Sequence, residues 1–158
     1  MGHTMHSWRS RKHQPPQYAD YTLFVAEVAS TVNENLLIEQ LLQNENDPQT
    51  RLYLLNQYLE NFKGTVYRQT MFAEFELRMA ELSAQGVTLT AEVLCEEYRK
   101  LNALYYGDDV VLDDEIALEW ARIPHFYYNY YVFQYATGYA AAIALSEGTV
   151  SYTHLRAH

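Results

Sequence analysis

The stretch "YTLFVAEVASTVNENLLIEQLLQN" (Tyr21–Asn44) decides the fold class of this sequence. Its apolar residues recur at three- and four-residue steps, which is the spacing that forms one stripe along an amphipathic α-helix. The stripe consists of Leu23, Phe24, Val28, Val32, Leu36, Leu37 and Leu41. We therefore predict a long helix here, closed by the polar "NENDP" that follows it.

The rest of the chain continues the helical pattern. Asp47 and Pro48 form an N-cap followed by a first-turn proline, which predicts a helix start. Thr90 is a predicted cap of the same kind, and Gly86 a predicted left-handed helix end. No alternating strand and no hairpin dipeptide is present, so we predict an all-α protein. The expected later helices span 49–63, interrupted by Gly64, then 65–86, 90–107, about 116–121, and an aromatic helix over about 126–145.

Composition limits the function classes. The chain has 158 residues and a formal net charge of −9, which permits one domain with a core. Nucleic acids and anionic membranes require clustered Lys and Arg, so neither is an expected partner. Cys95 is the single cysteine, which excludes an internal disulfide and fits a reducing compartment. The longest strongly apolar stretch, 139–145, is far shorter than the roughly 20 residues of a membrane span. We expect a soluble cytoplasmic protein.

The opening "MGH" fits the end of a metal-binding motif. In a His-Glu-x-x-His helix, two histidines one turn apart bind zinc and the Glu activates water. If His3 is the second histidine, the first histidine and the Glu fall before Met1. A chance start or a tag remnant would give the same letters. His6, three residues further on, is not a ligand in this interpretation.

Two carboxylates of the long predicted helix are candidates for the same chemistry. Glu27 interrupts the apolar run "TLFVAEVAS", where a carboxylate is costly to bury unless it is paired or bound to a metal. Glu34 lies two turns further along the same face. It could accept the spare ring N–H of a ligand histidine. A solvated side chain is the alternative for each of the two.

A tyrosine-rich run, "HFYYNYYVFQYATGY", begins at His125. Fifteen tyrosines in the chain make this residue unusually common. A row of tyrosines supplies apolar bulk with polar tips, which suits a helix that borders a wet cleft. An aromatic packing stripe is the alternative interpretation.

Long ordered strings in the chain closely resemble the thimet-type oligopeptidase family, and in particular its oligoendopeptidase F branch. The strings are "GHTMHSWRSRKHQPPQYADYTLFVAEVASTVNENLL", "LLNQYLENFKGTVYRQTMFAEFE" and "IPHFYYNYYVFQYATGYAAA". The resemblance implies the multi-helix half of a zincin-like catalytic domain. It implies that His3 and Glu27 are zinc ligands. The residues implied to position substrate and stabilise the oxyanion are His125, Tyr131 and Tyr135, with Tyr128 as a further candidate.

The resemblance implies zinc-dependent hydrolysis of short peptides, since the family's site lies in a deep channel that excludes folded proteins. The first motif histidine and the catalytic Glu are absent from this chain. We therefore expect residues 1–149 to be a partial catalytic domain whose partner is the missing N-terminal part of the same enzyme, with little activity alone. The ending "VSYTHLRAH" (150–158) breaks the helical pattern, and we interpret it as a non-native tail.

Two other classes of helical protein are alternatives. A ferritin-like di-iron bundle needs Glu-x-x-His pairs, and none of the six histidines has a Glu three places before it. A non-catalytic helical interaction module, binding through an acidic, Tyr-rich surface, is the remaining alternative. Zinc content would distinguish this alternative from a metallopeptidase.

Overall fold

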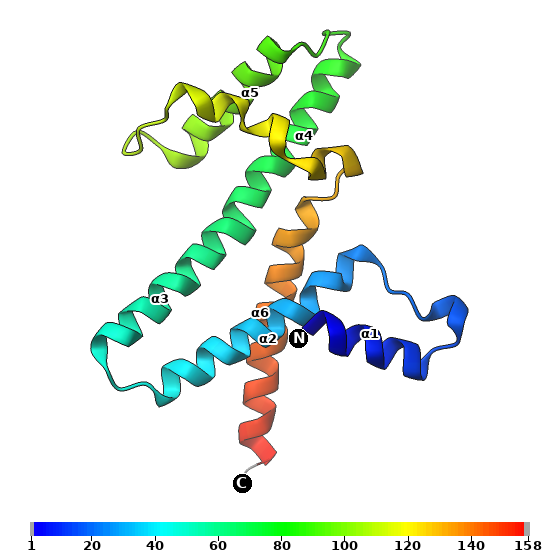
Figure 1. The fold of residues 1–158 in the computed structure, drawn as a ribbon, viewed down its shortest axis with the longest axis vertical. Coiled ribbons are helices and arrows are strands. Elements are labelled where there is room, and N and C mark those ends of the chain that lie inside the picture. Colours follow the sequence, from blue (N-terminus) through cyan, green and yellow to red (C-terminus); the bar gives the residue numbers. More distant parts are fainter. Residues whose placement is uncertain (1, 157–158) are drawn as a thin grey trace. The chain divides into compact units, whose positions relative to one another are not determined.

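The fold was obtained as a computed structural model that describes residues 2–156, except for the side chains of Leu23 and of residues 150–156. It contains helices and no strand within that range, which confirms the all-α prediction. The chain divides into two compact units, one made of residues up to Val66 together with those from Gln134, the other of Tyr67–Phe133. Figure 1 shows the course of the chain through its helices.

The first unit contains α1 (Gly2–His13), η1 (Pro16–Tyr18), α2 (Leu23–Asn44), α3 (Pro48–Phe62) and most of α6 (Phe133–Arg156). α1 packs against α2, and the connection between them is fixed by Tyr21. The Tyr21 ring stacks on His6 at 3.7 Å between centroids, and its hydroxyl lies 2.8 Å from Ser7 Oγ. The loop therefore holds the start of α2 beside α1.

The predicted helix start at Asp47 is confirmed. Asp47 Oδ2 accepts a hydrogen bond from the Thr50 N–H at 2.8 Å, and Pro48 is the first residue of α3. The interruption predicted at Gly64 is confirmed in position, since α3 ends at Phe62 and α4 begins at Arg68, but it takes the form of a π-helical turn (Lys63–Tyr67). A wider turn absorbs the glycine without ending the helical backbone.

The second unit is built from α4 (Arg68–Ala84), α5 (Ala91–Tyr106), η3 (Asp114–Arg122) and η4 (Pro124–Tyr128). The predicted Thr90 cap is confirmed, since its side chain accepts from the Val93 N–H. The predicted end at Gly86 is also confirmed by its φ of 81°. Aromatic rings fill the core, where Phe75 meets Tyr98 edge to face at 5.1 Å between centroids. The buried cluster comprises Met71, Phe72, Phe75, Tyr98, Leu101, Ile123 and Val132.

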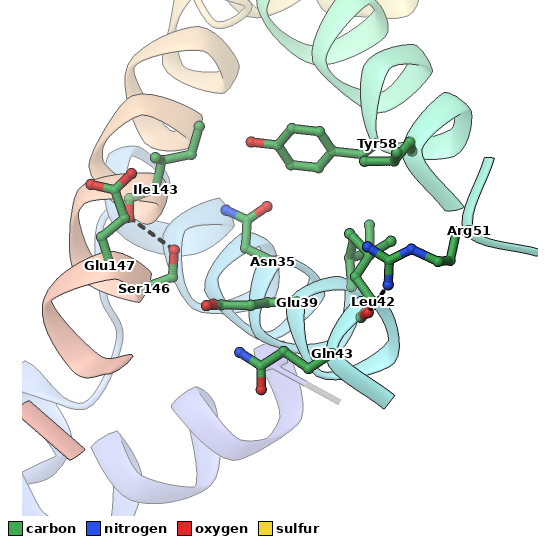
Figure 2. Close-up of a pocket in the computed structure, with 11 residues that line it drawn as sticks. Asn35, Glu39, Leu42, Gln43, Arg51, Tyr58, Ile143, Ser146 and Glu147 are labelled. Atoms are coloured by element: carbon green, nitrogen blue, oxygen red, sulfur yellow. Dashed lines mark hydrogen bonds between the residues drawn. The ribbon is translucent and has the colours of Figure 1, made fainter. Parts of the chain in front are cut away.

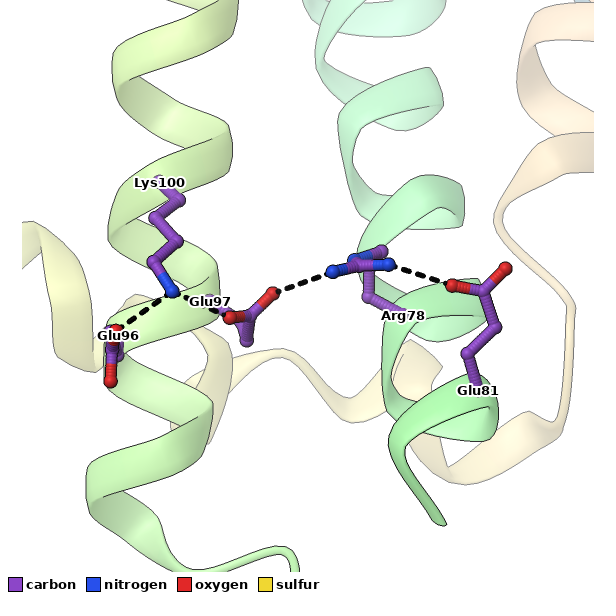
Figure 3. Close-up of polar contacts among 5 residues, drawn as sticks. All are labelled: Arg78, Glu81, Glu96, Glu97 and Lys100. Atoms are coloured by element: carbon purple, nitrogen blue, oxygen red, sulfur yellow. Dashed lines mark hydrogen bonds and ion pairs between the residues drawn. The ribbon is translucent and has the colours of Figure 1, made fainter. Parts of the chain in front are cut away.

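Ion pairs join α4 to α5 at the surface of the second unit, as Figure 3 shows. Arg78 lies 2.8 Å from Glu81 and 3.5 Å from Glu97, and Lys100 contacts both Glu96 and Glu97. Arg78 and Lys100 are exposed, so solvent screens these pairs and each contributes little. The aromatic core is therefore the main contact between the two helices.

Three boundaries differ from the prediction. Residues 114–122 form a 3₁₀ helix instead of an α-helix. The aromatic helix begins at Phe133 and not at Phe126, because Asn129 and Tyr130 both have positive φ and break the helix. α6 also runs on to Arg156, so the ending that was expected to break the helical pattern is helical as far as that residue; 157 and 158 lie outside the described part. No helix in the described part of the chain is long and apolar enough to cross a membrane.

Candidate active site

The packing of α1 against α2 brings His3 and Glu27 together. His3 Nε2 lies 3.4 Å from Glu27 Oε2, although 24 residues separate them in the sequence. The His3 side chain is 52% exposed and the Glu27 side chain 27% exposed, so both reach the surface of the unit. The predicted carboxylate therefore lies beside the predicted histidine, on a neighbouring helix.

The separation of these two atoms suits a shared zinc ion. Zinc binds imidazole nitrogen and carboxylate oxygen at about 2.1 Å in tetrahedral geometry, which puts two such ligand atoms about 3.4 Å apart. A direct hydrogen bond between nitrogen and oxygen is usually shorter, about 2.9 Å. The pair supplies two ligands, and within residues 2–156 no three His, Cys, Asp or Glu side chains come close enough to hold a metal. The residues present therefore fit half of a tetrahedral site.

Gly2 allows α1 to approach α2 this closely. A Cβ atom built on Gly2 would lie 2.5 Å from the Ser30 Cα and 2.6 Å from the Ala29 carbonyl oxygen. Both atoms belong to the α2 backbone, which has no rotamer through which to move away. The role of Gly2 was not predicted from the sequence. The one feature that could have indicated it is a glycine directly before a candidate ligand.

Two further residues contact Glu27. Ser30 Oγ donates to the Glu27 carbonyl oxygen at 3.0 Å and lies 3.4 Å from Oε2. Gly138 of α6 lies 3.8 Å, measured from a Cβ built on it, from the Glu27 Cβ. The Glu27 carboxylate thus lies between His3 of α1 and Ser30 of its own helix, and α6 passes its Cβ at a residue without a side chain.

Glu34 is exposed on α2, two turns beyond Glu27. The negative charge of Glu34 acts on the hydroxyl of Tyr139, which is buried in the first unit. Burial, the neighbouring Tyr58 and then the negative charge of Glu34 raise the pKa of the Tyr139 hydroxyl to about 12. Tyr139 is therefore a neutral packing residue near neutral pH, and its ring meets Phe62 edge to face.

The second predicted group lies in the other unit. The His125 ring stacks on Tyr131 at 5.6 Å between centroids, and Tyr128 lies 6.1 Å from Tyr131. His125 and Tyr131 are half-buried, whereas Tyr128 is 68% exposed. The left-handed residues Asn129 and Tyr130 reverse the chain between them, so three of the four predicted donors gather around one turn.

Tyr135 lies on a different element from these three residues. The aromatic helix predicted over about 126–145 would have placed Tyr131 and Tyr135 on one helix. This is wrong, because Tyr131 precedes the first residue of α6. Tyr135 lies in the first turn of α6, in the unit that also contains His3 and Glu27.

A buried carboxylate fixes the chain just before His125. Glu119, on η3, accepts hydrogen bonds from the Tyr98 hydroxyl at 2.8 Å and from Arg68 and Arg122. Burial alone would raise the pKa of Glu119, but these hydrogen bonds outweigh it and lower the pKa. Glu119 is therefore ionised and holds η3 to α4 and α5. Sequence analysis missed it, since one Glu in "ALEWAR" carries no distinctive pattern.

A separate cavity of about 690 Å³ lies among α2, α3 and α6 of the first unit, as Figure 2 shows. Asn35 and Tyr58 line it, and the Asn35 amide nitrogen is buried without a hydrogen-bond partner within the described residues. None of the predicted site residues lines this cavity. The candidate chemistry therefore lies at the contact between α1 and α2 and at the turn after His125.

Comparison with known proteins identifies the family. The model of peptidase family M3 matches residues 1–151. Oligopeptidase PepF of Bacillus subtilis is 61% identical over 145 residues, covering 92% of this chain and 22% of that protein. The chromosomal oligoendopeptidase F of Lactococcus lactis is 53% identical over 150 residues, covering 95% of this chain and 25% of that protein.

A solved structure agrees with these matches. The crystal structure of oligoendopeptidase-F from Enterococcus faecium matches with a TM-score of 0.81 and 54% identity, covering 96% of this chain and 27% of the other. The chain thus spans about a quarter of the length of the relatives that it matches. On the match to nearly its whole length and the shared helical fold, this chain belongs to peptidase family M3.

Proposed function

We propose that these residues are part of a zinc-dependent oligoendopeptidase that hydrolyses short peptides. The observation that carries the proposal is the 3.4 Å separation of His3 Nε2 and Glu27 Oε2 on two helices of a chain from peptidase family M3. The named relatives are an oligopeptidase and oligoendopeptidases, which supports short peptides as the substrate class. The single cysteine fits a cytoplasmic location.

In this proposal His3 and Glu27 supply two of the zinc ligands. When bound, zinc would act as a Lewis acid toward the scissile carbonyl and lower the pKa of water. Ser30 lies beside the Glu27 carboxylate, and Glu34 accepts the spare N–H of a ligand histidine. A further ligand and the general base come from the N-terminal part of the enzyme, because these 158 residues contain no His-Glu-x-x-His motif.

The residues around the turn after His125 bind the substrate in this proposal. His125 and Tyr131 donate hydrogen bonds to the oxygen on which negative charge develops, with Tyr128 and Tyr135 as further donors. The stacking of His125 on Tyr131 supports this assignment, since two donors held together can serve one oxyanion. The 158-residue chain alone lacks the general base, and we propose that it does not cleave peptides and that residues 150–158 are a non-native tail.

The test uses a chimera, defined as the full-length Bacillus subtilis relative with its matching 145-residue segment replaced by that of this chain. Zinc content and hydrolysis of a fluorogenic short peptide are measured for the chimera and for three variants. His3→Ala and Glu27→Ala are expected to lose zinc. His125→Ala is expected to keep zinc but lose turnover by roughly 100-fold or more, the usual cost of one oxyanion donor.

The results distinguish a zinc-dependent peptidase from a non-catalytic interaction module. A chelator should abolish cleavage by the chimera, and added zinc should restore it. Wild-type zinc content in both His3→Ala and Glu27→Ala would contradict the ligand assignment. A chimera that neither binds zinc nor cleaves peptides would favour the non-catalytic interaction module. Zinc-dependent cleavage by the 158-residue chain alone would contradict the proposal that it is inactive.

A further inference from the structure

The turn that carries the predicted donors has an unusual backbone. Asn129 has φ of 52° and Tyr130 has φ of 54°, so two consecutive residues that are not glycine are left-handed. Asparagine tolerates this region, but a bulky aromatic residue rarely adopts it. Such a backbone persists only where its surroundings fix it. A specific contact must therefore hold this turn.

Glu76 of α4 makes that contact. Its Oε1 accepts a hydrogen bond from the Tyr130 N–H at 3.0 Å, across 54 residues of sequence. Glu76 is 6% exposed, and its Oε2 has no hydrogen-bond partner within the described part of the chain. Burial raises the pKa of this carboxyl, and the bond from Tyr130 offsets only part of that effect. An apolar residue would be less costly at this position, so the bond to the turn explains the presence of a carboxyl.

The ends of the segment are fixed in a different way. Ile123 and Val132 are 6% and 0% exposed and belong to the aromatic core. Phe126 also packs on the core through Phe72 and Phe75. After it the Tyr127, Tyr128 and Tyr130 side chains are exposed, so apolar packing alone leaves the turn itself loosely determined. The hydrogen bond that Glu76 accepts from the Tyr130 N–H thus fixes the exposed turn of a segment that the core holds on both sides.

We propose that Glu76 is a positioning residue for peptide hydrolysis, which orients the His125 and Tyr131 donors by holding the left-handed turn at Asn129–Tyr130. The inference rests on the proposed function of these donors. Glu76 is buried and acts through the backbone, and it touches neither substrate nor metal in this proposal. Without its bond the turn relaxes toward ordinary backbone angles, and the stacked pair loses its orientation.

The experiment uses the chimera with three variants. Glu76→Met keeps the buried volume but removes the acceptor, and Glu76→Gln keeps an acceptor oxygen. Glu74→Ala is the matched control, because Glu74 lies on the same helix and accepts a bond from the Tyr105 hydroxyl at 2.7 Å instead of from the turn. Turnover, KM, zinc content and amide hydrogen exchange are measured for each.

Glu76→Met is expected to lower kcat about 10-fold or more, because donors misplaced by about 1 Å cost up to about 100-fold. Its KM and zinc content should change little. Glu76→Gln should restore most of the turnover, and Glu74→Ala should stay close to the unmodified chimera. Wild-type kcat in Glu76→Met, an equal loss in Glu74→Ala, or no rescue by Glu76→Gln would each overturn the positioning role.

Two measurements keep the test decisive. If Glu76→Met does not fold, exchange at the Tyr130 amide of the unmodified chimera decides: strong protection supports the role, and fast exchange overturns it. His125→Ala separates this inference from the proposed function. If His125→Ala keeps wild-type turnover, the proposed donors themselves are wrong; if it loses turnover while Glu76→Met does not, only the positioning role fails.

Discussion

Replacing Gly2 with alanine is expected to separate His3 from Glu27. The added Cβ would lie 2.5 Å from the Ser30 Cα, whereas ordinary contact begins at 3.4 Å. The difference, 3.4 − 2.5, requires α1 to move about 0.9 Å away from α2. His3 directly follows Gly2 and moves with it, so the 3.4 Å separation of the ligand atoms increases. Overpacking of this kind typically costs about 1–3 kcal/mol.

The assay measures two quantities. Urea unfolding of the 158-residue chain gives the free energy of unfolding, and zinc titration of the chimera gives the affinity of the site. Gly2→Ala should lower both. Gly148→Ala is the matched control, because Gly148 lies in α6 with nothing within 4 Å of the added Cβ. That control should be neutral or stabilise the helix by roughly 0.5–1 kcal/mol.

Two results for Gly2→Ala would contradict or limit the expected displacement of α1. An unchanged free energy of unfolding together with unchanged zinc affinity in Gly2→Ala would show that α1 accommodates the methyl group. The contact between α1 and α2 would then not determine the ligand geometry. A loss of stability without a loss of zinc affinity would limit the role of Gly2 to packing.

Three further changes test the second unit and its turns. Glu119→Ala leaves the Tyr98 hydroxyl without its acceptor and Arg68 and Arg122 without their carboxylate. Urea unfolding at pH 7 should show that the free energy of unfolding falls by about 3 kcal/mol. This difference from the unmodified chain should shrink at acid pH, where Glu119 becomes protonated, because its pKa is lowered in the folded state. The pKa of Glu76 is raised, so the unmodified chain should lose stability as the pH rises above about 4.5; Glu76→Gln should remove this loss in unfolding curves recorded across pH. Gly86→Ala should cost about 1–2 kcal/mol in thermal unfolding, because Gly86 has φ of 81°; an unchanged melting temperature would contradict this reasoning.

The long α-helices and their caps were predictable from the sequence because they depend on local chemistry. The apolar spacing in 21–44, the Asp47 cap and the left-handed Gly86 each act within one or two turns of the chain. The start of α6 was not predictable in this way. The run "HFYYNYYVFQYATGY" has good helical spacing, but its backbone turns left-handed at Asn129 and Tyr130, where the Tyr130 N–H donates to Glu76, 54 residues away in the sequence. A tertiary contact overrode the local preference.

Some residues of the candidate site could also be found from the sequence, and others could not. His3 and Glu27 were candidates from motif spacing and from the cost of burying a carboxylate, and the resemblance to the oligopeptidase family implied that both bind zinc. The structure brings their atoms within 3.4 Å of each other. Gly2 and Glu119 were missed, because their roles depend on what lies opposite them in space. A glycine gives no sign in the sequence that another helix backbone will lie against it.

The two groups of candidate residues depend on different kinds of support. The geometry of His3 and Glu27 depends on an absent side chain, since any Cβ at Gly2 would push α1 away from α2. The geometry of His125 and Tyr131 depends on an added polar group, since Glu76 supplies the acceptor for a backbone N–H that the left-handed turn presents. A methyl group added at Gly2 would therefore change zinc affinity. Loss of the Glu76 carboxyl would change turnover with the metal still bound. Because the two changes have different readouts, Gly2→Ala and Glu76→Met together test whether binding of the metal and orientation of the donors are separable properties of this chain.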